Sequence, residues 1–150
     1  VLLKSYSATG FVFYTNLKSQ KGISIKYNPH VALNFHWKSL LRQVRIEGVA
    51  KLIENAEAEA YFNTRPKLSR IGAWASSQSS ELTSREKLED KVNEYKKKFK
   101  EKKIPRPSHW SGFRVEPNLI EFWQDKPFRL HDRIKFVKLK NDWIGKRLYP

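Results

Sequence analysis

Residues 42–53, RQVRIEGVAKLI, decide the fold class of this 150-residue chain. Val44 and Ile46 fall on one face of an extended segment, because side chains of a strand alternate between its two faces. Gln43 and Arg45 fall on the opposite, polar face. This period of two is typical of a half-buried strand in an antiparallel sheet. The stretch therefore predicts a strand with one apolar face on a core and one polar face directed away from it.

Further strands are expected on both sides of this segment. Residues 1–6 (VLLKSY) and 10–15 (GFVFYT) are rich in β-forming side chains and flank a Ser/Thr/Gly turn, so they predict a hairpin. Residues 31–37 (VALNFHW) alternate well enough for another strand. In the C-terminal third, the segments that read as strands are residues 112–117, 119–124, 128–139 and 142–150.

The middle of the chain changes to a helical pattern. A helix is expected over residues 55–66, ending at Pro66, and a short helix that runs into a small-residue loop over 68–80. Thr83 and Glu86 have the spacing of a capping box at the start of another helix. The apolar stripe of that helix is Leu88, Val92, Tyr95 and Phe99.

Antiparallel strands at both ends with helices between them predict a mainly β fold with inserted helices (α+β), built as a small β-barrel. Residues 1–150 are interpreted as one domain, in which the strands of residues 108–150 take part. The chain contains no methionine and its first residues already read as a strand, so an N-terminal segment is expected to be missing.

Charge and composition limit the classes of function. The net charge is +15 and there is no cysteine, which excludes disulfides, thiolate catalysis and cysteine-ligated zinc; no metal site is expected. The charge fits nucleic acid or phosphorylated small ligands. The densest basic run, residues 95–103, lies on an expected helix, where a solvated face explains it. Nucleic acid is therefore not predicted as a partner. A membrane is not predicted either, since no apolar run approaches the roughly 18 residues of a membrane span.

Four clusters combine phosphate-binding side chains with aromatic rings. They are Lys4; Tyr14 and Thr15 with Ser19, Gln20 and Lys21; Tyr61, Arg65 and Ser69; and Arg129, His131 and Arg133 with Trp123 upstream. Tyr61 and Arg65 are four residues apart and would share a helix face, offering a hydroxyl and a guanidinium fork to a phosphate. Arg129, His131 and Arg133 alternate with other residues, so on an extended strand all three would project from one side.

Each cluster also has a purely structural interpretation. Tyr61 and Arg65 fit a surface pair, and a single histidine such as His131 is commonly a structural hydrogen-bonding group. Trp123 fits a core position, and Gln78 with Ser79 fits an ordinary loop. The residues alone therefore indicate a phosphorylated ligand and leave its identity open.

Several motifs together resemble those of the pyridoxine (pyridoxamine) 5'-phosphate oxidase family. In chain order they are VLLK, GFVFYTN, SQKG, NP, RQVRIEG, YFNTRP with LSRIGAWAS, QSS, SRE, W-S-G-F-R, EFWQ, RLHDR and the terminal RLYP. They extend from the first residue to the last. The resemblance implies an FMN-binding split β-barrel and a cytoplasmic homodimer with FMN at the subunit interface.

The resemblance also implies an activity. The enzyme would oxidise pyridoxine or pyridoxamine 5'-phosphate to pyridoxal 5'-phosphate. Hydride would pass from the substrate C4' carbon to the flavin N5, and dioxygen would reoxidise the flavin and release hydrogen peroxide. The protein's task would be to hold the two rings in position for transfer.

By the same resemblance, site residues carry over position by position. The substrate phosphate would meet Lys4, Tyr61, Arg65 and Ser69, and Arg129 and His131 would lie over the substrate ring as catalytic residues. The FMN residues would be Val1, Leu2, Leu3, Lys4, Tyr14, Thr15, Gln20, Lys21, Gln43, Gln78, Ser79, Trp123 and Arg133. Gln20 departs from the family, where arginine is frequent, and an arginine that precedes VLLK in the family lies outside this chain.

Two other classes of function remain as alternatives. One is a non-catalytic module that binds flavin or pyridoxal phosphate on the same barrel, without oxygen uptake. The other is nucleic-acid binding, which the net charge of +15 favours but the placement of the aromatic residues does not.

Overall fold

The computed structural model describes residues 1–140 and 142–150. Within them, seven strands form one sheet, in which every pairing is antiparallel. The strands are β1 (Ser5–Ser7), β2 (Gly10–Asn16), β3 (His30–Trp37), β4 (Arg42–Leu52), β5 (Trp110–Gln124), β6 (Asp132–Leu139) and β7 (Asp142–Leu148). The helices are α1 (Gln20–Tyr27), α2 (Asn55–Thr64), α3 (Lys67–Ala75) and α4 (Arg85–Lys98), with short 3₁₀ turns η1 (Lys38–Leu40) and η2 (Pro127–Arg129).

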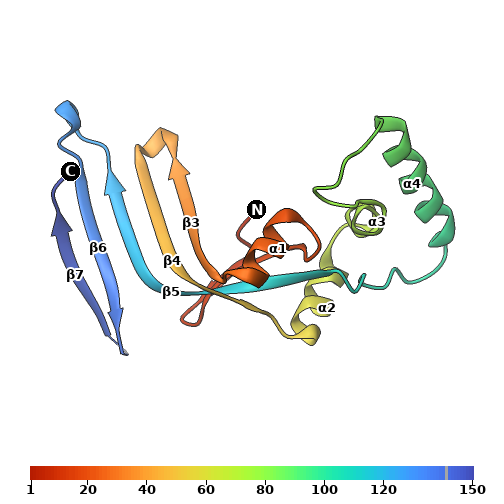
Figure 1. Ribbon diagram of the computed structural model, residues 1–150, viewed down its shortest axis with the longest axis horizontal. Helices are drawn as coiled ribbons and strands as arrows, with labels where there is room; N and C mark the ends of the chain where they lie inside the picture. Colours follow the sequence, from red (N-terminus) through yellow and green to blue (C-terminus); the bar gives the residue numbers. More distant parts are fainter. Residues whose placement is uncertain (141) are drawn as a thin grey trace.

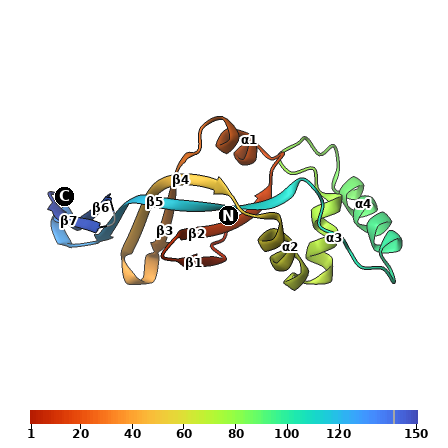
Figure 2. The same cartoon turned by 90° about the horizontal axis from the view of Figure 1, so that it is seen from below.

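The long strand β5 connects the two ends of the molecule. Its first half pairs with β2, its second half pairs with β6, and β4 runs beside most of its length. Figure 1 shows that the sheet curls along β5, with α2, α3 and α4 at one end and the β6–β7 hairpin at the other. Figure 2, from below, shows the same separation.

An irregularity between β4 and β5 allows this curvature. The register shifts between Glu47 and Gly48, where Gly48 lies opposite Pro117. Pro117 cannot donate a backbone hydrogen bond, and bulges are where a sheet tolerates it. A Cβ on Gly48 would collide with the backbone of Glu116, so glycine permits the close approach of the two strands.

Within the described residues, the two largest clusters of buried apolar side chains hold the fold. One lies at the centre of the sheet and contains Phe13, Ile25, Ala50, Phe113 and Val115. The other lies under the helices and contains Phe62, Ile71, Phe99, Ile104 and Trp110. Full burial of each large apolar side chain contributes about 1.5–3 kcal/mol. The helical cluster fixes α2, α3 and α4 against the start of β5.

The predicted fold class is confirmed: the chain is mainly β, with helices inserted between the strands. The helix expected at residues 55–66 ends at Thr64, and Val92, Tyr95 and Phe99 of α4 pack on the helical cluster. The two segments predicted at residues 112–117 and 119–124 form one strand, because the bulge accommodates Pro117.

Two local expectations were wrong. Ser84, rather than Thr83, caps α4, because its side chain accepts a hydrogen bond from the backbone N–H of Lys87. The hairpin at the start of the chain begins at Ser5, and only the backbone N–H of Lys4, bonded to the Val12 carbonyl, extends its pairing.

Candidate active site

The predicted phosphate cluster comes together in one pocket. Lys4, Tyr61, Arg65 and Ser69 all line a pocket of about 360 Å³, although they come from the start of the chain, α2 and α3. Its remaining lining residues are Leu2, Tyr14, Thr64, Pro66 and Trp110. The pocket therefore gathers an ammonium, a guanidinium and two hydroxyl side chains that the sequence analysis had singled out.

Pro66 places Arg65 in this pocket. A residue that precedes proline is pushed out of the helical region, and Arg65 has extended torsion angles (φ −71°, ψ 147°) just after the end of α2. The expectation that Tyr61 and Arg65 share a helix face is therefore corrected, because Arg65 lies outside the helix. The chain turns at Pro66, α3 begins at Lys67, and Ser69 in its first turn reaches the same pocket.

The Arg65 guanidinium lacks a partner within the described residues. Its Nη1 atom is buried and makes no hydrogen bond there, and its Cζ lies 4.7 Å from the centroid of the Trp110 ring. Burial lowers the pKa of Arg65, while neighbouring Tyr61 acts in the opposite direction. A buried donor without a protein acceptor is costly, so this atom is suited to an acceptor supplied by a ligand.

Three aromatic rings form one wall of the pocket. Tyr14 stacks on Tyr61 with ring centroids 3.9 Å apart, and Trp110 stacks on the Tyr14 ring at 5.2 Å. The pKa of Tyr14 is raised, first by burial and then by the charge of Glu57. Its hydroxyl therefore keeps its proton and can donate a hydrogen bond at neutral pH.

A second pocket of about 320 Å³ adjoins the first and shares Tyr14, Arg65, Ser69 and Trp110 with it. Here Gln78 Oε1 accepts hydrogen bonds from Thr15 Oγ1 at 3.2 Å and from the Asn16 N–H at 3.4 Å. Lys21 Nζ lies 3.5 Å from the same oxygen. Three donors that converge on one oxygen are suited to a phosphate or carbonyl oxygen of a ligand.

The remaining residues predicted at this end are less enclosed. Val1 and Leu2 are exposed, and Leu2 borders the first pocket. Gln20 is exposed at the first position of α1, and Ser79 is exposed with a left-handed backbone (φ 70°) beside Gln78. Leu3 is partly exposed at 37%. These residues lie near the pockets in the chain, but Gln20, Ser79, Val1 and Leu3 do not line them.

Gln43, Trp123 and Arg133 form a second group at the other end of the sheet. Gln43 on β4 pairs with Trp123 on β5, and Trp123 pairs with Arg133 on β6. Residues paired directly across strands point to the same face, so the three side chains form one row. The sequence analysis grouped Trp123 with Arg133 and assigned all three residues to one cofactor, but it gave no indication that Gln43 lies beside the other two.

The C-terminal trio does not share one strand. The strand expected at residues 128–139 begins only at Asp132, because Pro127 opens a 3₁₀ turn in which Phe128 and Arg129 both have positive φ (58° and 62°). Arg129 is exposed on this turn. The prediction of three side chains in a single alternating strand was therefore wrong.

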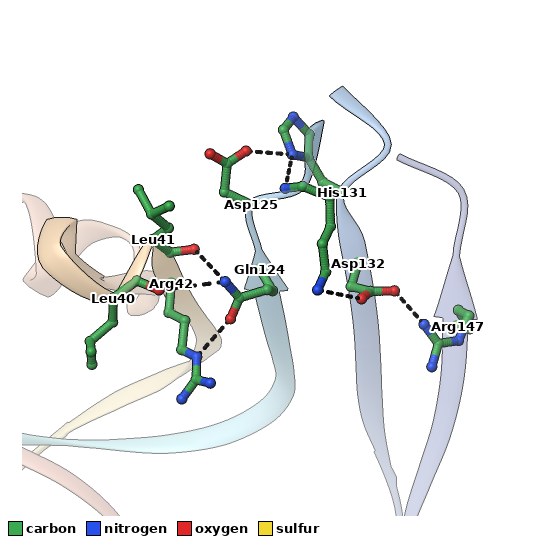
Figure 3. A network of polar contacts seen from close by, with 9 residues as sticks. Leu40, Leu41, Arg42, Gln124, Asp125, His131, Asp132 and Arg147 are labelled. Carbon is green, nitrogen blue, oxygen red and sulfur yellow. Dashed lines mark hydrogen bonds and ion pairs between the residues drawn. The ribbon is translucent and has the colours of Figure 1, made fainter. Parts of the chain in front are cut away.

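His131 nonetheless lies close to the row. Its ring is 4.7 Å from the ring of Trp123, and its Nδ1 lies 2.9 Å from Asp125 Oδ1. The same nitrogen accepts the Lys126 N–H at 3.2 Å, so His131 closes the turn that carries Arg129 (Figure 3). Figure 3 also shows Asp132 beside this turn, paired with Arg147 at 2.6 Å.

The two groups of site residues are far apart within one chain. Trp110 borders the phosphate pocket and Trp123 belongs to the row, at opposite ends of β5. At about 3.3 Å per residue, a straight strand between them would span on the order of 40 Å. Figures 1 and 2 show helices α2, α3 and α4 and the β6–β7 hairpin at opposite ends of the molecule.

Sequence reasoning missed two residues that the structure places in the site. Trp110 lines both pockets and stacks under Arg65, and Glu121 pairs with Arg133. Alternation along EFWQ could have placed Glu121 on the same face as Trp123. Nothing in the sequence indicates that Trp110 and Arg65 meet, because that contact depends on how the helices pack.

A curled antiparallel sheet with helices at one end is the architecture of a split β-barrel. The fold is similar to that of an FMN-binding, pyridoxamine 5'-phosphate oxidase-related protein from Nostoc punctiforme, with TM-score 0.75 and 13% identity over 99% of this chain and 78% of that chain. It is also similar to PhzG from Burkholderia lata, solved with tetrahydrophenazine-1-carboxylic acid, with TM-score 0.91 and 30% identity over 99% of this chain and 72% of that one.

The sequence comparisons define the family. Residues 2–99 match the family described as "Pyridoxamine 5'-phosphate oxidase", and residues 110–150 match the "Pyridoxine 5'-phosphate oxidase C-terminal dimerisation region". A pyridoxine/pyridoxamine 5'-phosphate oxidase from Mesorhizobium japonicum is 56% identical across 100% of this chain and 74% of its own length. The corresponding Gluconobacter oxydans protein is 53% identical across 100% of this chain and 75% of its own length.

The chain therefore belongs to the pyridoxamine 5'-phosphate oxidase family and is an oxidoreductase. The resemblance inferred from the sequence motifs is confirmed. Among the described residues, no helix combines the length and apolar character needed to cross a membrane.

Proposed function

We propose that the protein oxidises pyridoxine 5'-phosphate or pyridoxamine 5'-phosphate to pyridoxal 5'-phosphate, with FMN as cofactor and dioxygen as acceptor, releasing hydrogen peroxide. The observation that carries this proposal is the pocket of Lys4, Tyr61, Arg65 and Ser69, with the unpartnered Nη1 of Arg65 in its wall. Membership in the oxidase family supports the same reaction.

The donor set supports FMN as the cofactor. Thr15, Lys21 and the backbone of Asn16 offer donors at the second pocket, where Gln78 now accepts them. The row of Gln43, Trp123 and Arg133 offers an amide, an aromatic face and a guanidinium to a ring system. When bound, FMN would supply the hydride acceptor, a chemistry that no side chain provides.

The protein's own residues would bind and orient. Lys4, Arg65, Tyr61 and Ser69 would hold the substrate phosphate, far from the reacting carbon, and so fix the position of the ring. Arg129 and His131 would lie over that ring and hold it in position for transfer. Tyr14 lines both pockets, and burial raises the pKa of its hydroxyl, so this group would be a neutral hydrogen-bond donor between them.

We propose that the two groups of residues meet across a homodimer, with FMN at the interface. The phosphate pockets and the Trp123 row lie at opposite ends of the folded subunit. In the dimer, the pockets of one subunit would therefore face the row of its partner. The match to a C-terminal dimerisation region supports this arrangement.

Large apolar side chains are also exposed at the end of the sheet that carries the Trp123 row, including Trp37, Phe122 and Ile144 at 45%, 47% and 45%. A groove of about 580 Å³ there is lined partly by Trp37, Phe122 and Ile134. Exposed apolar surface of this kind is typical of protein interfaces.

The test uses the purified protein saturated with FMN. It should be yellow, release FMN on denaturation, and consume oxygen as it converts pyridoxamine 5'-phosphate to an aldehyde. Binding of both ligands without oxygen uptake would instead establish the alternative of a non-catalytic binding module. The expected cytoplasmic location belongs to the same proposal and is tested by fractionation of cells that express the protein.

A further inference from the structure

Glu121 lies on β5 in the row next to the one that contains Arg133, on the same face of the sheet. Gln43, Trp123 and Arg133 form that row, and the next row on the same face consists of Arg45, Glu121 and Lys135. Residues two positions apart on a strand share a face, so the second row supports the first. Glu121 is the central member and the only carboxylate in either row.

Glu121 is a buried anion held by two guanidinium groups. The residue is 7% exposed, and its Oε1 accepts a hydrogen bond from Arg133 Nε at 2.8 Å. Its Oε2 accepts one from Arg45 Nη2 at 3.2 Å. The hydrogen bond from Arg133 is the largest cause of the lowered pKa of Glu121, and burial opposes it. The carboxylate is therefore charged at neutral pH.

These contacts leave the Arg133 guanidinium little freedom. Its Nε is bonded to Glu121, and its Nη1 donates to the Tyr149 carbonyl oxygen at 3.2 Å. Within the described residues, Nη2 makes no hydrogen bond to protein. Because the guanidinium is planar, fixing two of its nitrogens also fixes the direction of the third.

We propose that Glu121 is a positioning residue that orients Arg133 toward FMN. This inference rests on the proposed function, which assigns Arg133 to the cofactor. Glu121 itself touches no ligand in this assignment; it acts by fixing the guanidinium before the cofactor arrives, so that less side-chain freedom is lost on binding. A buried ion pair does not by itself imply greater stability than an apolar pair, so stability alone does not account for its presence.

The experiment compares FMN affinity between two carboxylate variants of the same network. Glu121→Gln removes the charge next to Arg133, and the matched control Glu47→Gln removes a carboxylate that pairs with Arg45 and does not contact Arg133. The dissociation constant is measured by flavin fluorescence on apo-dimer reconstituted with FMN, and the fold by circular dichroism and thermal denaturation.

We expect Glu121→Gln to weaken FMN binding by about 3–10-fold, the cost of ordering one freed side chain on binding, and Glu47→Gln to change it by less than about twofold. In an Arg133→Ala background, Glu121→Gln should have little further effect, because its proposed target is absent. Glu121→Asp keeps the charge and should bind FMN more tightly than Glu121→Gln does. If Glu121→Gln does not fold, Glu121→Asp takes its place in the comparison.

The outcomes separate this inference from the proposed function. If Arg133→Ala binds FMN as tightly as the unchanged protein, the assignment of Arg133 to the cofactor fails. If Arg133→Ala weakens binding but folded Glu121→Gln, or folded Glu121→Asp in its place, does not, only the positioning role of Glu121 is overturned. Equal losses from Glu121→Gln in the presence and absence of Arg133 would also overturn it.

Discussion

Gln43 and Arg133 lie on either side of Trp123, in a single row across β4, β5 and β6. Gln43 is remote in the sequence from Trp123 and Arg133, and the resemblance to the family assigned all three to the cofactor. The pairing of the strands puts an amide, an indole and a guanidinium on one face. The phosphate-suited pockets lie at the other end of β5, and under the proposed function a second subunit would bring its own pockets to this row.

Arg65→Ala should chiefly weaken substrate binding. We expect KM for pyridoxamine 5'-phosphate to rise by about 10–100-fold, because a guanidinium contact with a phosphate is a charge-assisted hydrogen bond, while kcat changes less. Steady-state oxygen uptake measures both constants. Arg65→Lys keeps the charge but loses the fork of the guanidinium, so its KM should lie between those of the unchanged protein and Arg65→Ala. An unchanged KM in Arg65→Ala would contradict the placement of the phosphate.

Mixed dimers should recover activity that neither variant has alone. We expect Arg65→Ala to lose substrate binding and Arg129→Ala to lose turnover. In a dimer with one subunit of each kind, one shared site carries both changes and the other carries neither. Roughly half of the activity of the unchanged dimer should return, since sites of a two-fold dimer are equivalent.

The measurement uses two affinity tags to isolate the mixed dimer, assayed at substrate concentrations below KM. Each variant dimer alone is the control. If each subunit instead built its complete site from its own residues, every site in the mixed dimer would carry one change. Activity that stays at the level of the single variants would therefore contradict the shared site.

Because of Glu121, the free energy of unfolding should depend on pH in the acidic range. Its pKa in the folded protein is lowered from 4.5, so its carboxylate contributes stability above about pH 4.5 and loses that contribution as the pH falls through the lowered folded value. Glu121→Gln should reduce the free energy of unfolding by about 1–3 kcal/mol at pH 7. Urea denaturation should show this difference narrowing below pH 4.5; a difference that widens in acid would show that the sign is wrong.

Two glycine substitutions should change stability in opposite directions. A Cβ on Gly48 would collide with the β5 backbone at Glu116 and Pro117, so Gly48→Ala should lower the free energy of unfolding by about 1–3 kcal/mol. Gly72 lies within α3 with nothing within 4 Å of the added carbon, and Gly72→Ala should raise stability by about 0.5–1 kcal/mol. Thermal denaturation of the two variants tests both, and equal effects would contradict this account of the bulge.

Most elements could be predicted because their signals are local. The alternation at residues 42–53, the stop at Pro66 and the stripe on α4 each depend on neighbours in the chain, and each matches the structure. The turn at Phe128 and Arg129 could not be predicted in this way. Alternating residues suggested a continued strand, but Pro127 and the contacts of His131 with Asp125 and Lys126 close a turn instead.

The sequence by itself determined the fold class, the family and the kinds of side chain available to bind phosphate and an aromatic ring. Only the tertiary structure decided that Lys4, Tyr61, Arg65 and Ser69 share a pocket, that Trp110 stacks under Arg65, and that Glu121 holds Arg133. The physical reason is that periodicity and turn signals act over a few residues. Cross-strand register, helix packing and the burial of charge depend on contacts between segments that are remote in the chain.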